Sequence, residues 1–486
     1  MEAMLNDAIS TINGYLWSYF IIFILIGAGL FFTMTTNFVQ IRMIKEMVRL
    51  VINGAGSSTE KNHVSSFQAF CVSTASRVGV GNIAGIAIAV VLGGPGAIFW
   101  MWVIALIGAA TGFIESTLAQ IYKEPVAKGG FYGGPAYYIR YGLNNKALSV
   151  LFAILISITY GWIYNSVQAN TLAASLQVFN LDVSYTGAVV AVLLGIIIFG
   201  GINRVAKASE IIVPIMAILY IATALFVVIM NITQFPHVIY TIISSAFEPV
   251  AAGGGLLGAT VMNGIKRGLF SNEAGEGSVP NAAATAAVNH PVEQGLVQAF
   301  GVFLDTFIIC TASAFIVLMV GDYSTTGLTG VALVQHNLEQ QLGSWAPTAV
   351  AIFIVMFSFS SLIGNYYYGE INISHLTDKK FYLHLFRIGV IIMTFVGSIA
   401  SLDLVWNLAD LFMAFLVLTN ISSIVRMGRT AGLALDDYIK QRKAGIETPV
   451  FNRSVLNHTY GIVWWGDGQT TDSSVPPTPV EATMEK

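Results

Sequence analysis

The sequence predicts an all-α polytopic membrane protein with 11 transmembrane helices, arranged as two inverted repeats of five helices after one extra N-terminal helix. Three observations lead to this prediction. Of the 486 residues, 55% are hydrophobic and 10% are charged, whereas about 25% are charged in ordinary soluble domains. Apolar stretches of about 20 residues, the length that crosses a bilayer, recur along the chain. Lys and Arg residues are confined to alternate segments between these stretches. This composition excludes a soluble enzyme, a disordered chain and a nucleic-acid-binding protein.

Eleven apolar stretches are long enough to span a bilayer. The first carries no charge and is too long for a signal-peptide core, so we expect a retained transmembrane helix. The predicted spans are residues 15–35, 65–92, 96–121, 147–170, 184–201, 209–231, 240–269, 293–320, 347–370, 383–400 and 404–425. Over residues 38–52, apolar side chains recur at helical spacing with basic residues between them. This segment is predicted to be an amphipathic helix that lies on the inner leaflet or packs on another protein element.

The basic residues indicate the orientation of the chain. With an odd number of spans, the two termini lie on opposite sides of the membrane. If the N-terminus is outside, every Lys and Arg except Arg77 lies in an inner segment, as the positive-inside rule requires. We therefore expect a multi-pass protein of the cell membrane with an outer N-terminus and a cytoplasmic C-terminus.

The spans divide the chain into four segments. Residues 1–64 hold the N-terminal transmembrane helix and the inner amphipathic segment, 65–235 the first repeat (spans 2–6), 236–430 the second repeat (spans 7–11), and 431–486 the cytoplasmic tail. The end of the tail is polar and has no periodic apolar face, which predicts that the tail is mostly disordered.

Two spans are interrupted by small and polar residues. The second contains Ser73-Thr74-Ala75-Ser76-Arg77-Val78-Gly79-Val80-Gly81-Asn82, and the seventh contains Ala251-Ala252-Gly253-Gly254-Gly255. Glycine in a span permits either close helix packing or local unwinding. Unwinding frees N–H groups that suit a carboxylate and carbonyl groups that suit Na⁺.

The position of these interruptions favours unwinding. Spans 2–6 and 7–11 are two sets of five, so the two halves have opposite topology, and each half begins with a glycine-interrupted helix. This arrangement is typical of inverted-repeat secondary transporters, whose binding site lies where the two broken helices meet.

Several motifs resemble one family of transporters. Residues 93–108, with the sequence GGPGAIFWMWVIALIG, resemble the signature of the alanine-or-glycine:cation symporter family, the sodium:alanine symporters. Residues 131–139, 267–275 and 366–370 are similar to further stretches of that family. The resemblance covers about residues 15–440. It implies amino-acid uptake driven by Na⁺, or by H⁺ in some members, on a leucine-transporter-like fold with an extra N-terminal helix.

The resemblance also implies roles for individual residues. N–H groups around Gly79 and Gly81 would hold the substrate carboxylate, and oxygens from spans two and nine would hold Na⁺. Together with the positions near the break, the predicted substrate-binding residues are Arg77, Gly79, Gly81, Gln168, Gly254, Ser361 and Asn365, and the predicted sodium-binding residues are Ala75, Val78, Asn82, Ser360 and Ser361. Two alternatives stay open. The two serines could bond to their own helix, and Gln168 could form a helix–helix hydrogen bond.

Two positions depart from the family pattern and bear on the substrate. Many members carry Thr where Arg77 stands and Trp where Asn365 stands. Both departures make the pocket region more polar. The resemblance implies symport of a small neutral amino acid of the alanine/glycine class, whereas the departures favour glutamine or another polar amino acid as the alternative, with Na⁺ or H⁺ as the coupling ion.

Charged residues inside spans are costly and usually functional. Arg77 and Asp305 lie at matching depths in spans two and eight. Asp305 is therefore expected to pair with Arg77, to ligate a cation or to face a wet cavity. Glu115, near the inner end of span three, is expected to cap or bridge helices.

Other functional classes lack their motifs. No phosphate-binding Gly-x4-Gly-Lys-Ser/Thr loop is present, so we expect no nucleotide. No cluster of His, Cys or paired carboxylates indicates an enzyme, a catalytic residue or a metal site other than sodium, and no cofactor is expected. Cys71 and Cys310 are far apart in apolar stretches and predict no disulfide. The expected partners are an amino-acid substrate, Na⁺ and the lipid bilayer.

Overall fold

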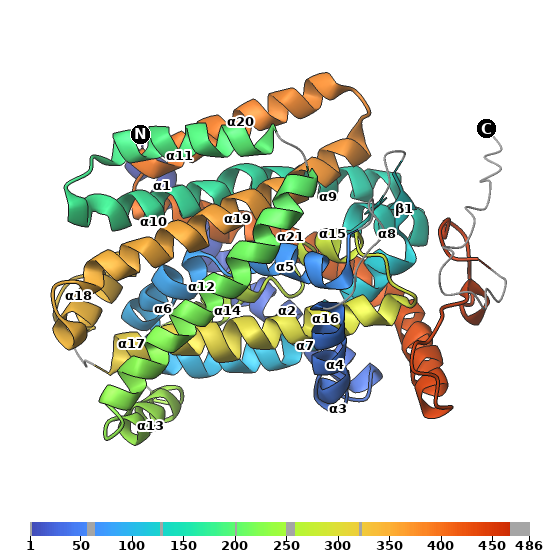
Figure 1. Ribbon diagram of the computed structural model, residues 1–486, viewed down its shortest axis with the longest axis horizontal. Coiled ribbons are helices and arrows are strands. Elements are labelled where there is room, and N and C mark those ends of the chain that lie inside the picture. The colour runs from blue at the N-terminus through green and yellow to red at the C-terminus, as the bar shows by residue number, and fades with distance from the viewer. Residues whose placement is uncertain are drawn as a thin grey trace.

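The computed structural model describes residues 2–55, 64–126, 130–199, 202–248, 258–319 and 323–466. They form a bundle in which most long helices run along the longest axis of the molecule (Figure 1). Helices α13 (Phe235–Ser245) and α18 (Gly330–Leu342) lie at one end of the bundle. Helix α8 (Pro135–Gly142) and the antiparallel strands β1 (Glu124–Pro125) and β2 (Phe131–Tyr132) lie at the other end.

The remaining elements follow the predicted segments in chain order. The N-terminal part consists of α1 (Glu2–Leu16), the π-helix η1 (Trp17–Ile21), α2 (Ile22–Thr35), α3 (Val39–Arg42) and α4 (Ile44–Ala55). The next part adds α5 (Ser66–Arg77), η2 (Gly81–Gly85), α6 (Ile86–Gly93), α7 (Gly96–Ile121), α9 (Lys146–Ile158), η3 (Thr159–Tyr164), α10 (Asn165–Ser175), η4 (Leu176–Phe179), α11 (Val183–Ile198) and α12 (Ile202–Met230). The last part adds α14 (Ala259–Asn272), α15 (Val279–Ala283), α16 (Pro291–Phe303), η6 (Leu304–Cys310), α17 (Thr311–Leu318), α19 (Ala346–Leu376), α20 (Lys380–Ile399), α21 (Leu402–Lys443) and η7 (Arg453–Val455).

Most of the predicted spans are present as helices. In the described part of the chain, eight continuous helical stretches are long and apolar enough to cross a membrane, and α5 with η2 and α6 forms one further span bent by 50°. The predicted fifth span is the shorter apolar helix α11. The predicted seventh span includes residues 249–257, which lie outside the described residues, so the count of 11 and the repeat layout stay predictions. The chain is a mostly helical, multi-pass membrane protein.

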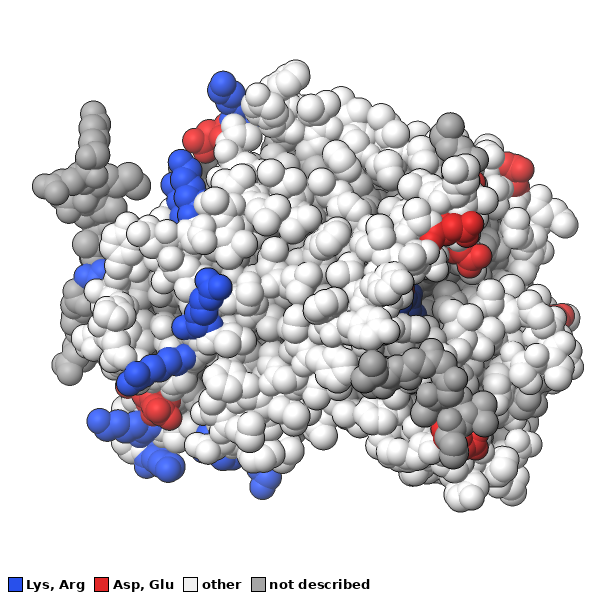
Figure 2. Space-filling model, turned by 180° about the vertical axis from the view of Figure 1, so that it is seen from behind, with Lys and Arg blue, Asp and Glu red and all other residues white. Residues whose placement is uncertain are grey.

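Charge is distributed as the spans require. On the face shown in Figure 2, most visible Lys and Arg side chains gather at one end and Asp and Glu prevail at the other. The broad surface between them is almost uncharged. Such a belt suits a lipid environment.

Local sequence explains where the bent span starts and breaks. Ser65 and Gln68 form a capping box, in which Ser65 Oγ accepts from the Gln68 N–H at 3.0 Å, so α5 begins at Ser66. The helix ends at Arg77 because Val78 leaves the helical region, with φ −83° and ψ 85°. Helical structure resumes at Gly81 as the π-helix η2.

Helix α4 confirms that the amphipathic segment packs on another protein element. Met47 is fully buried, and Glu46 accepts a hydrogen bond from the Tyr438 hydroxyl of α21 at 2.7 Å. Ile44 and Ile52 of the same helix are exposed. The helix therefore packs on protein on one side and exposes apolar side chains on the other, and its contact with the inner leaflet stays a prediction.

The C-terminal segment corrects the expectation of a mostly disordered tail for residues 431–466. Helix α21 continues to Lys443, beyond the predicted end of the last span at residue 425. The following residues fold back, and Phe451, Trp464 and Trp465 are buried. Trp465 Nε1 donates to the Gln120 carbonyl at 2.9 Å. These apolar residues are too irregularly spaced to show a periodic face, but each packs against the end of the bundle. Residues 467–486 lie outside the described residues.

Candidate functional site

The break between α5 and η2 is held by side chains from elsewhere in the chain. Asn82 Oδ1 accepts from the Gly79 N–H at 2.9 Å, and Gln168 Oε1 of α10 accepts from the Val80 N–H at 3.1 Å. N–H groups released by the unwinding are thus engaged by amide side chains, as an apolar environment demands.

Oxygen atoms from the break and from α19 converge on the other side of the same segment. Ser361 Oγ donates to the Ala75 carbonyl at 2.9 Å and lies 3.4 Å from the Val78 carbonyl. Gly79 permits this approach, since a Cβ there would lie 2.4 Å from Ser361 Oγ. Two carbonyl oxygens and one hydroxyl oxygen form the kind of hard oxygen set that suits a hard cation such as Na⁺.

The other two residues of the predicted sodium set make no hydrogen bond to Ser361 or to the Ala75 and Val78 carbonyls in the described part of the chain. Ser360 Oγ donates to the Phe357 carbonyl of its own helix at 2.9 Å and lies 3.5 Å from Met216 Sδ. This is the local bonding that the sequence left open. Asn82 directs its Nδ2 to Asp305 Oδ1 at 2.6 Å. The structure therefore brings Ala75, Val78 and Ser361 together.

The hypothesis that Asp305 pairs with Arg77 is wrong in this structure. Arg77 Nη1 points to α16, where it donates to the Gln298 carbonyl at 3.2 Å, and it packs so closely on Gly301 that a Cβ there would lie 2.1 Å away. Asp305 instead accepts from Asn82 and from Ser271 Oγ at 2.9 Å. Within the described ranges, no ion pair includes either residue. Matching depth is not sufficient for contact, because the two side chains leave their helices in different directions.

Ser76 joins the break to a third element. Its hydroxyl lies 2.7 Å from Glu273 Oε1 and 2.8 Å from Asn365 Oδ1. The Asn365 side chain is buried, and its Nδ2 has no hydrogen-bond partner in the described part of the chain. Asn365 therefore has an unused amide donor near the break. Gly254, the remaining predicted substrate-binding residue, lies outside the described residues.

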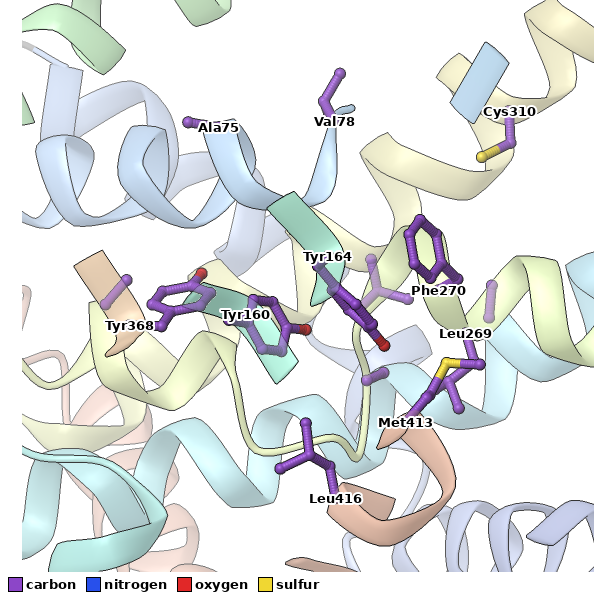
Figure 3. Close-up of a cluster of buried hydrophobic side chains, with 14 of the residues drawn as sticks. Ala75, Val78, Tyr160, Tyr164, Leu269, Phe270, Cys310, Tyr368, Met413 and Leu416 are labelled. Atoms are coloured by element: carbon purple, nitrogen blue, oxygen red, sulfur yellow. The ribbon is translucent and has the colours of Figure 1, made fainter. Parts of the chain in front are cut away.

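An aromatic cluster packs against the break. The Phe270 ring of α14 lies 4.7 Å from the Tyr164 ring and 4.8 Å from the Trp406 ring, between centroids. A Cβ on Gly81 would lie 2.7 Å from Phe270. Figure 3 shows Tyr160, Tyr164 and Phe270 lying in a row near the turn that carries Val78. Glycine at position 81 thus lets an aromatic side chain of the second half approach the backbone of the first.

For Glu273 and Glu276 the sequence left open a gating network with Arg267 or solvated loop charges, and the described part of the structure shows neither. Their segment, Glu-Ala-Gly-Glu-Gly, is typical of a solvated loop, yet both side chains are buried. Arg267, a basic neighbour, pairs instead with Asp410 of α21. Glu115 bridges helices as expected, accepting from the Gly275 N–H at 3.1 Å and from Asn420 Nδ2 at 2.7 Å.

A bundle of membrane-spanning helices with one span broken at a cluster of backbone and hydroxyl oxygens is typical of secondary transporters. Solved structures agree on this fold. The transporter MhsT in complex with L-phenylalanine is 14% identical, with a TM-score of 0.55 over 78% of this chain and 90% of its own. A manganese transporter of Eremococcus coleocola is 11% identical, with a TM-score of 0.52 over 78% and 87%.

Sequence comparison gives the family. The profile of the sodium:alanine symporter family matches residues 1–453, and the chain belongs to this family of sodium-coupled amino-acid transporters. The probable sodium/glutamine symporter GlnT of Bacillus subtilis (strain 168) is 50% identical over 96% of this chain and 97% of its own. The amino-acid carrier protein AlsT of the same organism is 48% identical over 96% and 99%. The sodium/alanine symporter AgcS of Methanococcus maripaludis is 39% identical over 86% and 93%. The family resemblance of the sequence is confirmed.

Proposed function

We propose that this protein imports a small neutral amino acid of the alanine/glycine class together with Na⁺ across the cell membrane. The convergence of Ser361 Oγ with the Ala75 and Val78 carbonyls carries the proposal. A Na⁺ ion bound by these oxygens would tie α19 to the broken helix α5 and fix the geometry of the unwound segment. The orientation with an outer N-terminus and the five-plus-five inverted repeat are part of this proposal.

Transport of Na⁺ and of the amino acid would be coupled because the proposed Na⁺ site lies next to the segment around Gly79 and Gly81 that would bind the substrate carboxylate. Na⁺ at Ala75 and Val78 would stabilise the arrangement that is open to the outside and ready for substrate. The substrate carboxylate would then take the N–H groups around Gly79 and Gly81, and closure would carry both solutes inward as the two repeats rock around the site. Each ligand would increase the affinity for the other.

Glutamine is the second candidate substrate. The unused Nδ2 of Asn365 is a hydrogen-bond donor near the break, and an amide side chain could accept from it whereas the methyl group of alanine could not. The relative GlnT, named as a probable sodium/glutamine symporter, is 50% identical to this chain. Protons are the alternative coupling ion.

Uptake into proteoliposomes tests the function. Radiolabelled alanine, glycine and glutamine are offered with an inward Na⁺ gradient, with an inward H⁺ gradient and with no gradient. We expect accumulation above the external concentration only with an ion gradient. Accumulation of amino acid that depends on neither the Na⁺ gradient nor the H⁺ gradient would exclude symport. Glutamine that fails to inhibit alanine uptake at large excess would exclude the second candidate.

A further inference from the structure

Besides Asp305, three buried carboxyl groups lie close to the break and have no basic partner. Glu115, Glu273 and Glu276 are at most 2% exposed. Among the residues that the structure describes, no Lys or Arg forms an ion pair with any of them. Glu115 and Glu273 each have both oxygens engaged, Glu273 by the hydroxyls of Ser76 and Ser278, both at 2.7 Å. These two carboxylates are therefore satisfied by hydrogen bonds.

Glu276 is different because one of its oxygens is unused. Its Oε2 accepts from the Tyr160 hydroxyl at 2.8 Å and from the Tyr164 hydroxyl at 3.1 Å. Its Oε1 is buried and has no hydrogen-bond partner in the described residues. Two further carboxyl groups lie near Glu276: its N–H donates to the Glu273 carbonyl at 3.3 Å, and Glu115 accepts from the N–H of the preceding residue, Gly275, at 3.1 Å. A buried oxygen of this kind indicates a bound proton, ion or water.

Tyr160, which bonds to Glu276, packs on its other side against a further buried tyrosine. The ring of Tyr368, from α19, lies 5.3 Å from the Tyr160 ring between centroids, and the Tyr368 hydroxyl is buried without a partner in the described part of the chain. Figure 3 shows the Tyr368 and Tyr160 rings lying next to one another. Among the described residues no hydrogen bond joins Tyr368 to Glu276, so the unused oxygen of Glu276 is the observation that points to a ligand here.

We propose that Glu276 is a monovalent-cation site that takes H⁺ or Na⁺ at its free Oε1. The proposal rests on the symport function proposed above and adds a second ion position to it. A proton would neutralise the carboxyl group, and a sodium ion would supply the missing counter-charge. Either cation removes the cost of an uncompensated charge among buried carboxylates.

The site connects to the substrate region through aromatic contacts. Tyr160 and Tyr164 both belong to the π-helix η3, and such irregular turns are frequent at functional sites. Tyr164 packs on Phe270, and Phe270 packs against Gly81 of the break. Cation binding at Glu276 that shifts Tyr164 would therefore act on the segment that holds the substrate carboxylate.

The charged and titratable groups around the site are few. Tyr160 and Tyr164 face Glu276 from η3, Glu273 from the same loop and Glu115 from α7. The Arg77 charge acts on Glu115 and Glu273, and the Asp410 charge acts on Tyr164. Glu276→Gln is the sharpest change, because glutamine keeps an oxygen for the two hydroxyls and removes the charge.

Equilibrium binding of radiolabelled alanine and glutamine to the purified full-length protein tests the proposal. Binding is titrated with Na⁺ at pH 6.0, 7.0 and 8.5 for the wild type, Glu276→Gln and Tyr160→Phe. If H⁺ is the ligand, wild-type affinity changes with pH, Glu276→Gln binds independently of pH, and Tyr160→Phe shifts the midpoint to higher pH. If Na⁺ is the ligand, Glu276→Gln needs several-fold more Na⁺ for half-maximal binding at every pH. Equal pH and Na⁺ profiles in the wild type and Glu276→Gln overturn the proposal.

Control variants separate the outcomes. Tyr220→Phe removes another buried hydroxyl, bonded to Ser313 at 2.6 Å, and is expected to behave as the wild type. If Glu276→Gln does not fold, Tyr160→Phe decides by itself, and profiles identical to those of the wild type count against the site. A wild type that shows no gradient-driven accumulation of amino acid in proteoliposomes defeats the symport function. If the wild type accumulates amino acid and the variants have the same pH and Na⁺ profiles as the wild type, only the proposal of a cation site at Glu276 is excluded.

Discussion

The Ser361 hydroxyl of α19 donates a hydrogen bond to the Ala75 carbonyl at the end of α5, across 2.9 Å. The two residues are 286 positions apart in the chain. Their contact joins the broken span to a helix of the second half, beside the unwound segment. An ion bound at this contact senses the geometry of both helices, which is what coupling requires.

Removing the Ser361 hydroxyl is predicted to weaken Na⁺ binding. For Ser361→Ala, the Na⁺ concentration at half-maximal uptake should rise about tenfold, equivalent to about 1.4 kcal/mol. Ser360→Ala should have a smaller effect, because Ser360 Oγ bonds to Phe357 and lies beside Met216. Na⁺ titrations of amino-acid uptake give both values. Equal shifts in the two variants would show that both hydroxyls face the ion.

Gly79 is predicted to tolerate no side chain. A Cβ at this position would lie 2.4 Å from Ser361 Oγ and 2.9 Å from the Gln168 amide, so Gly79→Ala must push apart the elements that meet at the break. Uptake should fall to background while the protein still reaches the membrane. Gly27→Ala in α2 is the matched control, since nothing lies within 4 Å of a Cβ there. Normal uptake by Gly79→Ala would contradict the described geometry.

Asn365 is predicted to discriminate between substrates. Replacing it with Leu removes the unused amide donor near the break. If glutamine is carried, competition assays should show a larger loss of affinity for glutamine than for alanine. The expected ratio reflects one lost hydrogen bond, about 1 kcal/mol. Equal losses for the two amino acids would indicate that Asn365 supports the helices rather than selecting the side chain.

Arg77 and Asp305 are predicted to act separately. Arg77 bonds to Gln298, and Asp305 bonds to Asn82 and Ser271. The loss caused by Asp305→Asn should therefore not be rescued by adding Arg77→Gln. Uptake by the two single variants and the double variant, corrected for the amount of protein in the membrane, measures this coupling. Recovery of transport in the double variant would show that the two charges pair in another state of the transport cycle.

The folded C-terminal segment is predicted to loosen in acid. His290 Nδ1 accepts from the Val292 N–H, so Nε2 carries the proton that faces Asp437 Oδ2 at 3.2 Å. Burial lowers the pKa of His290 below its ordinary value, although Asp437 opposes this. As the pH falls below about 6.5, the released state binds more protons than the docked state, so docking loses stability.

Hydrogen exchange measures this loss. Residues 444–466 of the wild type should exchange faster, relative to a His290→Gln variant at the same pH, as the pH is lowered from 7.5 to 5.5. Glutamine offers the same two hydrogen bonds without titrating in this range. A constant ratio between the two proteins across the pH range would mean that His290 does not control docking.

The sequence predicted the features that depend on composition and local pattern. Long apolar stretches predicted most spans, and the glycines at 79 and 81 predicted a break that the structure places after Arg77. The family resemblance implied Ala75, Val78 and Ser361, and these three converge. The spacing of residues along the sequence predicts which face of a helix each one occupies, but it does not predict which residue of another helix it contacts.

The remaining features depend on packing between distant segments. Ser360 and Ser361 are adjacent, yet the rotation of α19 sends one hydroxyl toward Met216 and the other toward α5. Arg77 and Asp305 share a depth but not a direction. In the sequence Glu276 resembles a carboxylate of a solvated loop, whereas in the structure it is buried and accepts hydrogen bonds from Tyr160 and Tyr164. Each of these outcomes is set by tertiary contacts that a single sequence does not display.

The central claim is that Na⁺ bound beside Ala75, Val78 and Ser361 is carried together with the amino acid. The most direct test is the influx of radiolabelled Na⁺ into proteoliposomes, measured with and without external alanine or glutamine. We expect one of these amino acids to accelerate Na⁺ entry in the wild type, and Ser361→Ala to lose most of the acceleration at low Na⁺. Na⁺ entry that neither amino acid changes, in a preparation that accumulates amino acid, would contradict this claim.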